Sequence, residues 1–199
     1  RKTFLKINKQ LITRLSDRKT GAGCDQIITI DKSRSAKIDC KITIYNANGD
    51  QVEACGNGTR CVAKLLFKEF DKKKVNIKSI AGKLQAELMS NGNVSVNMGI
   101  IKENWKEIPI KKNIDTKNIP IKVKNFSNGF ALNIGNPHIV FFGNNISGLN
   151  INIAGPKIEN HNLFPNKVNV EFVRIINKKK LTIKVWERGV GETLACGSG

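Results

Sequence analysis

The five-residue sequence Ala-Cys-Gly-x-Gly occurs twice in the chain, as Ala54–Gly58 and as Ala195–Gly199, 141 residues apart. Each copy follows a polar, turn-rich stretch, and the first copy leads into a segment with helical periodicity. The repeat places a cysteine with the same local sequence in each half of the chain. A fold of this chain must therefore present two similar thiol-bearing loops.

The residue types in this repeat suit acid–base chemistry. A thiol at a helix N-terminus meets the positive end of the helix dipole, which lowers its pKa from about 8.5 toward neutrality. The glycines let backbone N–H groups approach an anion closely. Two such thiols on opposite faces of one molecule would suit inversion at a carbon centre. The alternative interpretation is that both copies are tight turns with incidental cysteines.

The cysteine and glycine spacings exclude several other kinds of site. Gly56-x-Gly58 is followed by Cys61 where a dinucleotide-binding loop needs a third glycine, and the five cysteines form no Cys-x-x-Cys pair. His138 and His161 show no zinc-ligand spacing. We therefore expect no metal site and no dinucleotide cofactor. An odd number of cysteines cannot pair completely within the chain, so we expect free thiols and a cytoplasmic protein.

The positive charge has a weaker functional meaning. The formal net charge of the 199 residues is +18, but the lysines are scattered and aromatic residues make up 6% of the chain. Such a surface attracts polyanions without sequence specificity. We expect no specific nucleic-acid partner, and a basic nucleic-acid-binding module remains the alternative from another functional class. No apolar stretch approaches the length of a membrane-spanning helix, so no membrane partner is expected.

Hydrophobic periodicity predicts an α+β protein with few helices. Apolar residues at helical spacing predict a helix over Gly56–Phe70, and a weaker helical pattern over Ile151–Asn160 is interrupted by Gly155-Pro156. A change of polarity near Met98 predicts an N-terminal domain over residues 1–98 and a C-terminal domain over residues 99–199. Apolar alternation or β-forming composition predicts the following strands: Gln26–Asp31, Ala36–Asn46, Val75–Ile80, Leu84–Met89, Val94–Met98, Phe130–Ile134, Ile139–Phe142, Val168–Ile176 and Leu181–Trp186.

Four sequence blocks, in this order, resemble the diaminopimelate epimerase family. The first runs from Leu15–Arg18 through Gly21–Gln26, and the second combines Tyr45–Asp50 with Val52–Arg60 around the first repeat. The third is Gly135–Val140 with its Asn-Pro-His sequence, and the fourth is Glu187–Gly199 around the second repeat. One such block would be weak support, whereas four in the family order are specific.

The resemblance implies two pseudo-symmetric domains, each a curled, mainly antiparallel sheet around a central helix, with the substrate between them. It implies cofactor-independent epimerisation of LL-2,6-diaminopimelate to the meso form, in lysine and peptidoglycan precursor synthesis, by a homodimer. The family's N-terminal Gly-Asn-Asp-Phe segment and everything after the second cysteine loop have no counterpart here. We therefore expect a fold truncated at both ends and an inactive fragment of an active parent enzyme.

The resemblance also assigns roles to residues by their motif positions. Cys55 and Cys196 would be the two acid–base thiols, with His138 and Glu187 tuning them. Cys24 and Cys61 carry no assigned role and are expected to pack. Substrate contacts are implied for these residues: Gln26, Asn46, Gly56, Asn57, Asn136, Asn169, Glu187, Arg188, Gly197 and Ser198.

The nearest rival function is a racemase or isomerase of the same fold, such as a proline-racemase-like enzyme. Arg188 and Asn169 favour a substrate with a second charged end. A cysteine in both repeats argues against isomerases that use a single cysteine.

Overall fold

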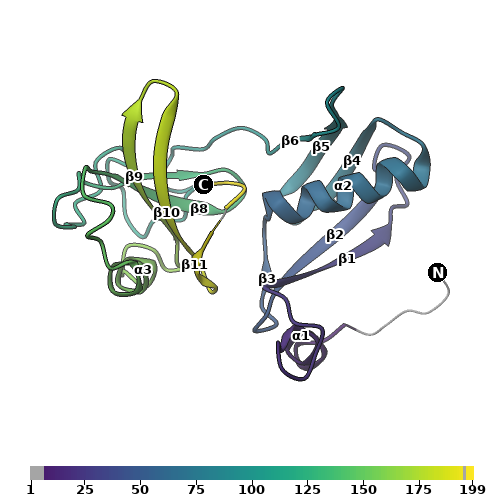
Figure 1. Cartoon of the computed structure of the whole chain (residues 1–199), viewed down its shortest axis with the longest axis horizontal. Coiled ribbons are helices and arrows are strands. Elements are labelled where there is room, and N and C mark those ends of the chain that lie inside the picture. The colour runs from purple at the N-terminus through teal and green to yellow at the C-terminus, as the bar shows by residue number, and fades with distance from the viewer. Residues whose placement is uncertain (1–6, 195) are drawn as a thin grey trace. The chain divides into compact units, whose positions relative to one another are not determined.

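A computed structural model describes residues 7–194 and 196–199. The chain separates into two compact units, Arg1–Asn97 and Met98–Gly199, which we call the N-terminal and C-terminal units (Figure 1). The division lies one residue before the predicted boundary. Each unit contains one sheet and its own hydrophobic core, so the α+β class predicted from the sequence is confirmed.

The N-terminal unit holds a sheet with the strand order β1-β2-β4-β5-β6, in which the short β3 also pairs with β2. The helix α2 packs against this sheet (Figure 1), with Val62 and Leu66 in the core beside Ile42 and Ile44. The elements are α1 (Lys9–Ser16), β1 (Gln26–Lys32), β2 (Cys40–Asn46), β3 (Gln51–Val52), α2 (Gly56–Phe70), β4 (Lys74–Ser79), β5 (Gly82–Leu88) and β6 (Val94–Asn97).

Strand β2 shows why alternation in the sequence predicts this sheet. Cys40, Ile42 and Ile44 are buried on the core face, whereas Lys41 is exposed on the other face. The strand begins at Cys40 rather than at the predicted Ala36, because the residues before it form a turn. Helix α2 has the predicted bounds, and it ends where Asp71 adopts a left-handed conformation with φ 50°.

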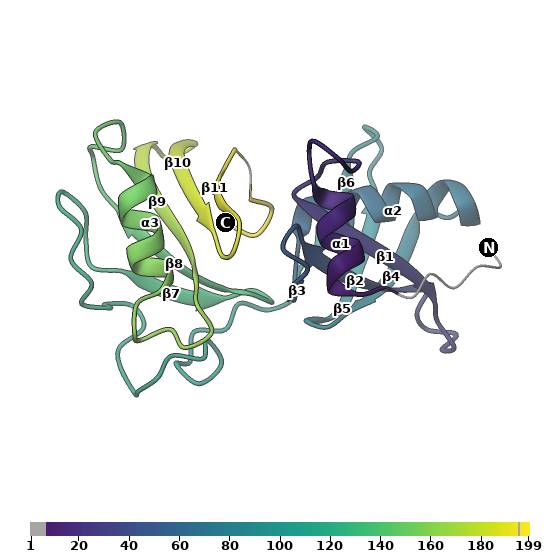
Figure 2. The same cartoon turned by 90° about the horizontal axis from the view of Figure 1, so that it is seen from below.

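The C-terminal unit holds a sheet with the strand order β11-β10-β9-β8-β7. Helix α3 packs against β9, β10 and β11 (Figure 2). Phe141 and Phe172 are fully buried at the centre of the core, with ring centroids 5.5 Å apart. The elements are β7 (Phe130–Asn133), β8 (Pro137–Phe142), α3 (Ile151–Glu159), β9 (Asn169–Asn177), β10 (Lys180–Glu187) and β11 (Gly191–Thr193).

Helix α3 forms despite the proline within it. Asn150 caps its N-terminus by accepting a hydrogen bond from the backbone N–H of Asn152. Gly155 lies against the indole ring of Trp186, where a Cβ would come 2.4 Å from a ring carbon. The glycine that weakens the helical pattern is therefore the residue that lets α3 dock on β10. No helix in the described part of the chain is long and apolar enough to cross a membrane.

The two units repeat the same succession of elements. A shift of 141 residues carries β2 onto β10 and β3 onto β11, and it carries α1 closely onto α3. The strand register is kept as well, because Ile44 pairs with Val52 in one unit and Val185 pairs with Thr193 in the other. Strands β1 and β9 are the antiparallel neighbours of β2 and β10. Cys55 and Cys196 therefore each follow the short third strand of the same supersecondary unit.

Candidate functional site

Cys55 is the N-cap of α2. Its backbone is extended, with φ −149° and ψ 101°, and its Sγ accepts a hydrogen bond from the N–H of Gly58 at 3.3 Å. Thr59 donates to the Cys55 carbonyl from its backbone N–H at 2.9 Å and from its hydroxyl at 2.8 Å. The sulfur thus lies at the positive end of the helix dipole and receives a backbone donor, an arrangement that stabilises negative charge on it.

Gly58 is required by close packing beside this sulfur. A Cβ at residue 58 would lie 2.4 Å from Cδ1 of Ile28 and 3.3 Å from Sγ of Cys55. Ile28 is partly buried against the core of the unit, so it has little room to move. The glycine that the repeat supplies here brings β1, the first turn of α2 and the cysteine together.

Two predicted substrate-binding residues of the N-terminal unit are bound to each other. Gln26 and Asn46 lie opposite one another in the β1–β2 ladder, and Nε2 of Gln26 donates to Oδ1 of Asn46 at 2.9 Å. Asn46 is buried at the end of β2, from which the β3 hairpin leads to Cys55. Asn57, in the first turn of α2, accepts a hydrogen bond from Arg60.

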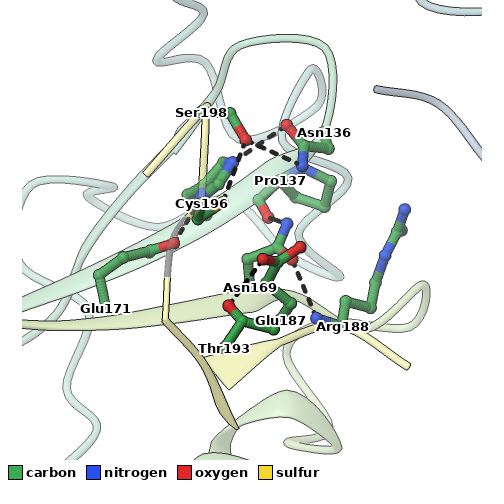
Figure 3. A network of polar contacts seen from close by, with 10 residues as sticks. Asn136, Pro137, Asn169, Glu171, Glu187, Arg188, Thr193, Cys196 and Ser198 are labelled. Carbon is green, nitrogen blue, oxygen red and sulfur yellow. Dashed lines mark hydrogen bonds and ion pairs between the residues drawn. The ribbon is translucent and has the colours of Figure 1, made fainter. Parts of the chain in front are cut away.

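In the C-terminal unit, a row of hydrogen bonds leads to the sulfur of Cys196 (Figure 3). Sγ of Cys196 lies 3.5 Å from Oγ of Ser198, which accepts a hydrogen bond from Nδ2 of Asn136 at 3.4 Å. Oδ1 of Asn136 lies 3.0 Å from Nε2 of His138. The other ring nitrogen of His138, Nδ1, lies 2.6 Å from Oε1 of Glu171. Both members of this last pair are almost completely buried.

The electrostatic setting of Cys196 opposes ionisation. Burial raises the pKa of its thiol, and the nearby charges of Glu187 and Glu171 raise it further, whereas the hydrogen bond with Ser198 lowers it. The lowering expected from a helix N-terminus is not found here. Gly197–Gly199 are not helical, so the sulfur has the local hydrogen bonds of Ser198 but no helix dipole behind them, and burial outweighs these bonds.

The loop between β10 and β11 carries the other predicted binding residues. Oδ1 of Asn169 accepts a hydrogen bond from the backbone N–H of Arg188 at 2.9 Å, and Nδ2 of Asn169 donates to the carbonyl of Pro137 at 2.9 Å. Glu187 accepts a hydrogen bond from the hydroxyl of Thr193 at 2.7 Å. Figure 3 shows these residues beside the row that ends at Cys196.

The buried carboxylate of Glu159 holds the loop between β10 and β11 in place. Glu159 of α3 accepts hydrogen bonds from Nε1 of Trp186 at 2.7 Å and from the backbone N–H of Gly189 at 3.0 Å. Lys167 forms an ion pair with the same carboxylate. These contacts hold the start and the middle of the loop on which Arg188 lies.

The structure gathers the predicted residues into two groups, one in each unit. Cys55, Gln26 and Asn46 with the first turn of α2 form the N-terminal group. Cys196, Ser198, Asn136 and His138, with Asn169, Glu187 and Arg188 beside them, form the C-terminal group.

Sequence reasoning missed Glu171, Glu159 and Thr193. The signal for Glu171 is present, since it is the one charged residue within the otherwise uncharged stretch Val168–Val173. Among the described residues, no group of three or more His, Cys, Asp and Glu side chains is placed to hold a metal ion. All five cysteines are free thiols.

The two sequence comparisons with known proteins give the same family. The sequence model of the family described as diaminopimelate epimerase matches residues 2–102 and 130–199. The diaminopimelate epimerase of Pelagibacter ubique is 43% identical over 197 residues, covering 96% of this chain and 71% of that protein. The diaminopimelate epimerase of Acidiphilium cryptum is 42% identical over 186 residues, covering 94% of this chain and 66% of that protein.

Among solved structures, a hydroxyproline epimerase from Agrobacterium vitis with bound trans-4-hydroxy-L-proline has a similar fold. Its TM-score is 0.63 at 12% sequence identity, and the match covers 96% of this chain and 62% of that one. This likeness supports the fold and no more, because the sequence identity is low.

Proposed function

This chain belongs to the diaminopimelate epimerase family of isomerases, and we propose that the full-length protein converts LL-2,6-diaminopimelate to the meso form without a cofactor. One observation carries the two-thiol form of this proposal. Cys55 and Cys196 follow the same short strand in a repeated supersecondary unit, so each half supplies one thiol from an equivalent place. The chain spans 66% and 71% of the length of the two relatives described above.

In the proposed reaction one cysteine acts as a thiolate and the other as a thiol. The thiolate takes the α-proton, so that the C–H bond breaks and an S–H bond forms. The resulting carbanion takes the proton of the second thiol on its opposite face, which leaves that sulfur as a thiolate. The two thiols are then exchanged in protonation state, and the carbon is inverted. Because the two sulfurs are coupled through the substrate, their titrations belong to the pair.

The carbanion is stabilised by hydrogen bonds to the adjacent carboxylate. We assign this role to backbone amides of Gly56 and Asn57 in the N-terminal unit and of Gly197 and Ser198 in the C-terminal unit. The support from the N-terminal unit is the first turn of α2, whose amides are directed toward the N-terminal end of the helix. A hydrogen bond to a charged group contributes roughly 1.5–3 kcal/mol, so four such bonds are a substantial part of the stabilisation.

The distant amino and carboxylate groups of the substrate need partners of their own. We assign them to Arg188, Asn46, Asn136, Asn169 and Gln26, and we assign the reacting ammonium group to Glu187. Asn169 holds the loop that carries Arg188 through the Arg188 backbone, and the guanidinium group donates to the carbonyl of Asn166 at 3.0 Å. A substrate with a second charged end would use this group, whereas proline would not.

The test is exchange of the α-hydrogen with solvent in the full-length protein. We expect Cys55→Ala and Cys196→Ala each to abolish epimerisation of LL-diaminopimelate in deuterium oxide. Cys61→Ala is the matched control, because Cys61 is an exposed free thiol on the same helix as the first cap. Wild type and the control should place deuterium at the inverted carbon. Substantial turnover in either active-site variant would refute the two-thiol mechanism.

The same assay separates the rival functions. Proline and hydroxyproline should gain no deuterium, whereas a proline-racemase-like enzyme would label them. A nucleic-acid-binding module would bind polyanions in a salt-dependent way that Cys55→Ala leaves unchanged, and it would label no amino acid. Labelling of diaminopimelate alone supports the proposal.

We also propose that the protein is cytoplasmic and that its full-length form is a homodimer. Its proposed role is in lysine synthesis. Five free thiols support a reducing compartment. Sedimentation of the full-length protein tests the dimer.

A further inference from the structure

A buried carboxylate lies at the far end of the hydrogen-bond row that reaches Cys196. Glu171 is 1% exposed, and it comes from β9, between the buried residues Val170 and Phe172. One carboxylate oxygen, Oε1, lies 2.6 Å from Nδ1 of His138, and the two buried side chains share this hydrogen bond. The other oxygen, Oε2, is buried without a hydrogen-bond partner among the described residues. Burying a carboxylate oxygen without a hydrogen-bond partner costs folding free energy, which suggests that Glu171 has a functional role.

The repeated fold shows what stands at the equivalent position beside the other cysteine. Glu171 lies opposite Val185 in the β9–β10 ladder, and Ile28 lies opposite Ile44 in the β1–β2 ladder. Val185 and Ile44 are themselves equivalent, because each also pairs with the short third strand. Ile28 is the side chain that packs beside Gly58 and Cys55. The two halves thus place an apolar residue near one thiol and a carboxylate near the other.

We propose that Glu171 is a positioning residue that makes the two otherwise equivalent thiols different. It holds the ring of His138 in one orientation, and its negative charge favours the thiol form of Cys196. Cys55, which has no carboxylate at the equivalent position and receives the Gly58 amide, is the thiolate of the pair. This assignment rests on the proposed function, because only a two-thiol reaction needs one acid and one base at rest.

The contacts account for both parts of this role. With Nδ1 of His138 bound to Glu171, the other ring nitrogen faces Asn136, whose amide reaches the hydroxyl of Ser198 beside the sulfur. A ring fixed in this way fixes the row of groups that ends at Cys196. Burial is the main cause of the raised pKa of the Cys196 thiol, and the charges of Glu187 and Glu171 act in the same direction. The charged groups that act on this thiol are Glu187 from β10 and Glu171 from β9, with His138 of β8 bound to the latter.

The proposal is tested by site-resolved alkylation of the 199-residue chain with iodoacetamide across pH 6–10. Only the thiolate reacts, so the rate reports its fraction. Peptide mass spectrometry reads Cys55 and Cys196 in the same molecules. In Glu171→Gln, which keeps an acceptor for His138 but removes the charge, we expect Cys196 to react severalfold faster near pH 7.5. Cys55 should react at its wild-type rate in every variant.

Two further variants separate charge from fold. Glu171→Ile installs the residue of the equivalent position, and we expect the reactivity of Cys196 to rise at least as much as in Glu171→Gln. Glu192→Gln removes an exposed charge from β11 and is the matched control, with no expected change at either thiol. Glu171→Asp, which restores the charge, should return the pH profile toward that of wild type and keeps the test open if Glu171→Ile does not fold.

Two outcomes would overturn the proposal. One is an unchanged Cys196 profile in folded Glu171→Gln, and the other is an equal rise at Cys55 and Cys196. Alkylation needs no turnover, so these results are independent of the deuterium assay that tests the proposed function. In the full-length protein, Glu171→Gln should lower kcat severalfold with KM little changed, because Glu171 is assigned no contact with substrate.

Discussion

Sγ of Cys55 accepts a hydrogen bond from the backbone N–H of Gly58 at 3.3 Å, so the proposed acid–base thiol is also the cap of helix α2. Sγ of Cys55 therefore has a structural role as the helix cap and a proposed chemical role as the acid–base group. Its structural task can be measured apart from the chemistry, because a serine hydroxyl keeps the acceptor and loses the thiol.

The first prediction separates these two tasks of Cys55. We expect Cys55→Ser to unfold within about 0.5 kcal/mol of wild type, and Cys55→Ala to lose about 1 kcal/mol of the free energy of unfolding, since alanine cannot cap. Both variants should be inactive in the full-length protein. Urea unfolding followed by far-ultraviolet circular dichroism measures the difference. Equal stability of the two variants would show that the sulfur does not act as a cap.

The second prediction concerns Gly58. A helix-interior Gly→Ala change ordinarily stabilises by up to about 1 kcal/mol. Here the added Cβ would lie 2.4 Å from Cδ1 of Ile28, so we expect Gly58→Ala to destabilise by about 1–3 kcal/mol. Ile28→Val removes that methyl group, and the double variant should be more stable than the sum of the single effects predicts. Additive effects would place the strain elsewhere.

Much of the N-terminal fold is predictable because its signals are local. Helix α2 has the predicted bounds, since its apolar residues Val62, Leu66 and Phe67 recur on one face and Gly56 follows a polar turn. Strand β2 buries every second side chain and leaves those between them partly or fully exposed, as its sequence pattern predicts. In both elements one periodicity covers enough residues to identify the structure and the buried face.

Helix α1 is not predicted from the sequence, and helix α3 is predicted only weakly, because local periodicity gives little signal for either. Helix α1 spans only Lys9–Ser16, with Ile12 and Ser16 as its buried residues, which is too short for a clear periodicity. Helix α3 contains Pro156, and its Gly155 packs closely on Trp186, 31 positions later in the chain. No local pattern reports such a contact.

In the candidate site, too, local motifs predict some features, whereas others depend on contacts between distant residues. The motifs mark residues such as His138 and Cys196, but they do not show that Asn136 and Ser198 link the two by hydrogen bonds. The role of Glu171 is visible only when β8 and β9 are paired, because the parallel register brings the two strands together across more than 30 residues of sequence. The sequence alone shows only that Glu171 is the one charged residue within Val168–Val173.

The third prediction uses the buried thiol of Cys40. Burial raises its pKa to about 11, with smaller contributions from Asp39, Asp31 and Glu69. Below pH 8 the thiol is protonated in both the folded and the unfolded chain and contributes no pH dependence. Between the unfolded pKa near 8.5 and about 11 the unfolded chain loses the proton first. The free energy of unfolding therefore falls with rising pH, by at most about 1.4 kcal/mol per pH unit from this group.

Cys40→Val tests this effect, because valine fills a similar volume and does not ionise. Urea unfolding at pH 8 and pH 10.5 should show a smaller loss of stability in Cys40→Val than in wild type. Lysine and tyrosine titrations affect both proteins equally, so the difference between them isolates the thiol. An identical loss in the two proteins would contradict the assignment.

The last prediction concerns two exposed apolar residues of β10, Leu181 and Ile183, whose equivalents in the N-terminal unit are buried. Cys40 and Ile42 on β2 are 2% and 4% exposed, whereas Leu181 and Ile183 at the equivalent positions of β10 are 56% and 38% exposed. Exposed apolar side chains on a strand favour association with other chains. We expect the 199-residue chain to self-associate at high micromolar concentration and Leu181→Lys to reduce this association. Thr182→Lys, which adds the same charge on the opposite face of β10, should leave it nearly unchanged. Sedimentation velocity distinguishes the variants, and an equal effect of both lysines would attribute the change to net charge rather than to the apolar strip.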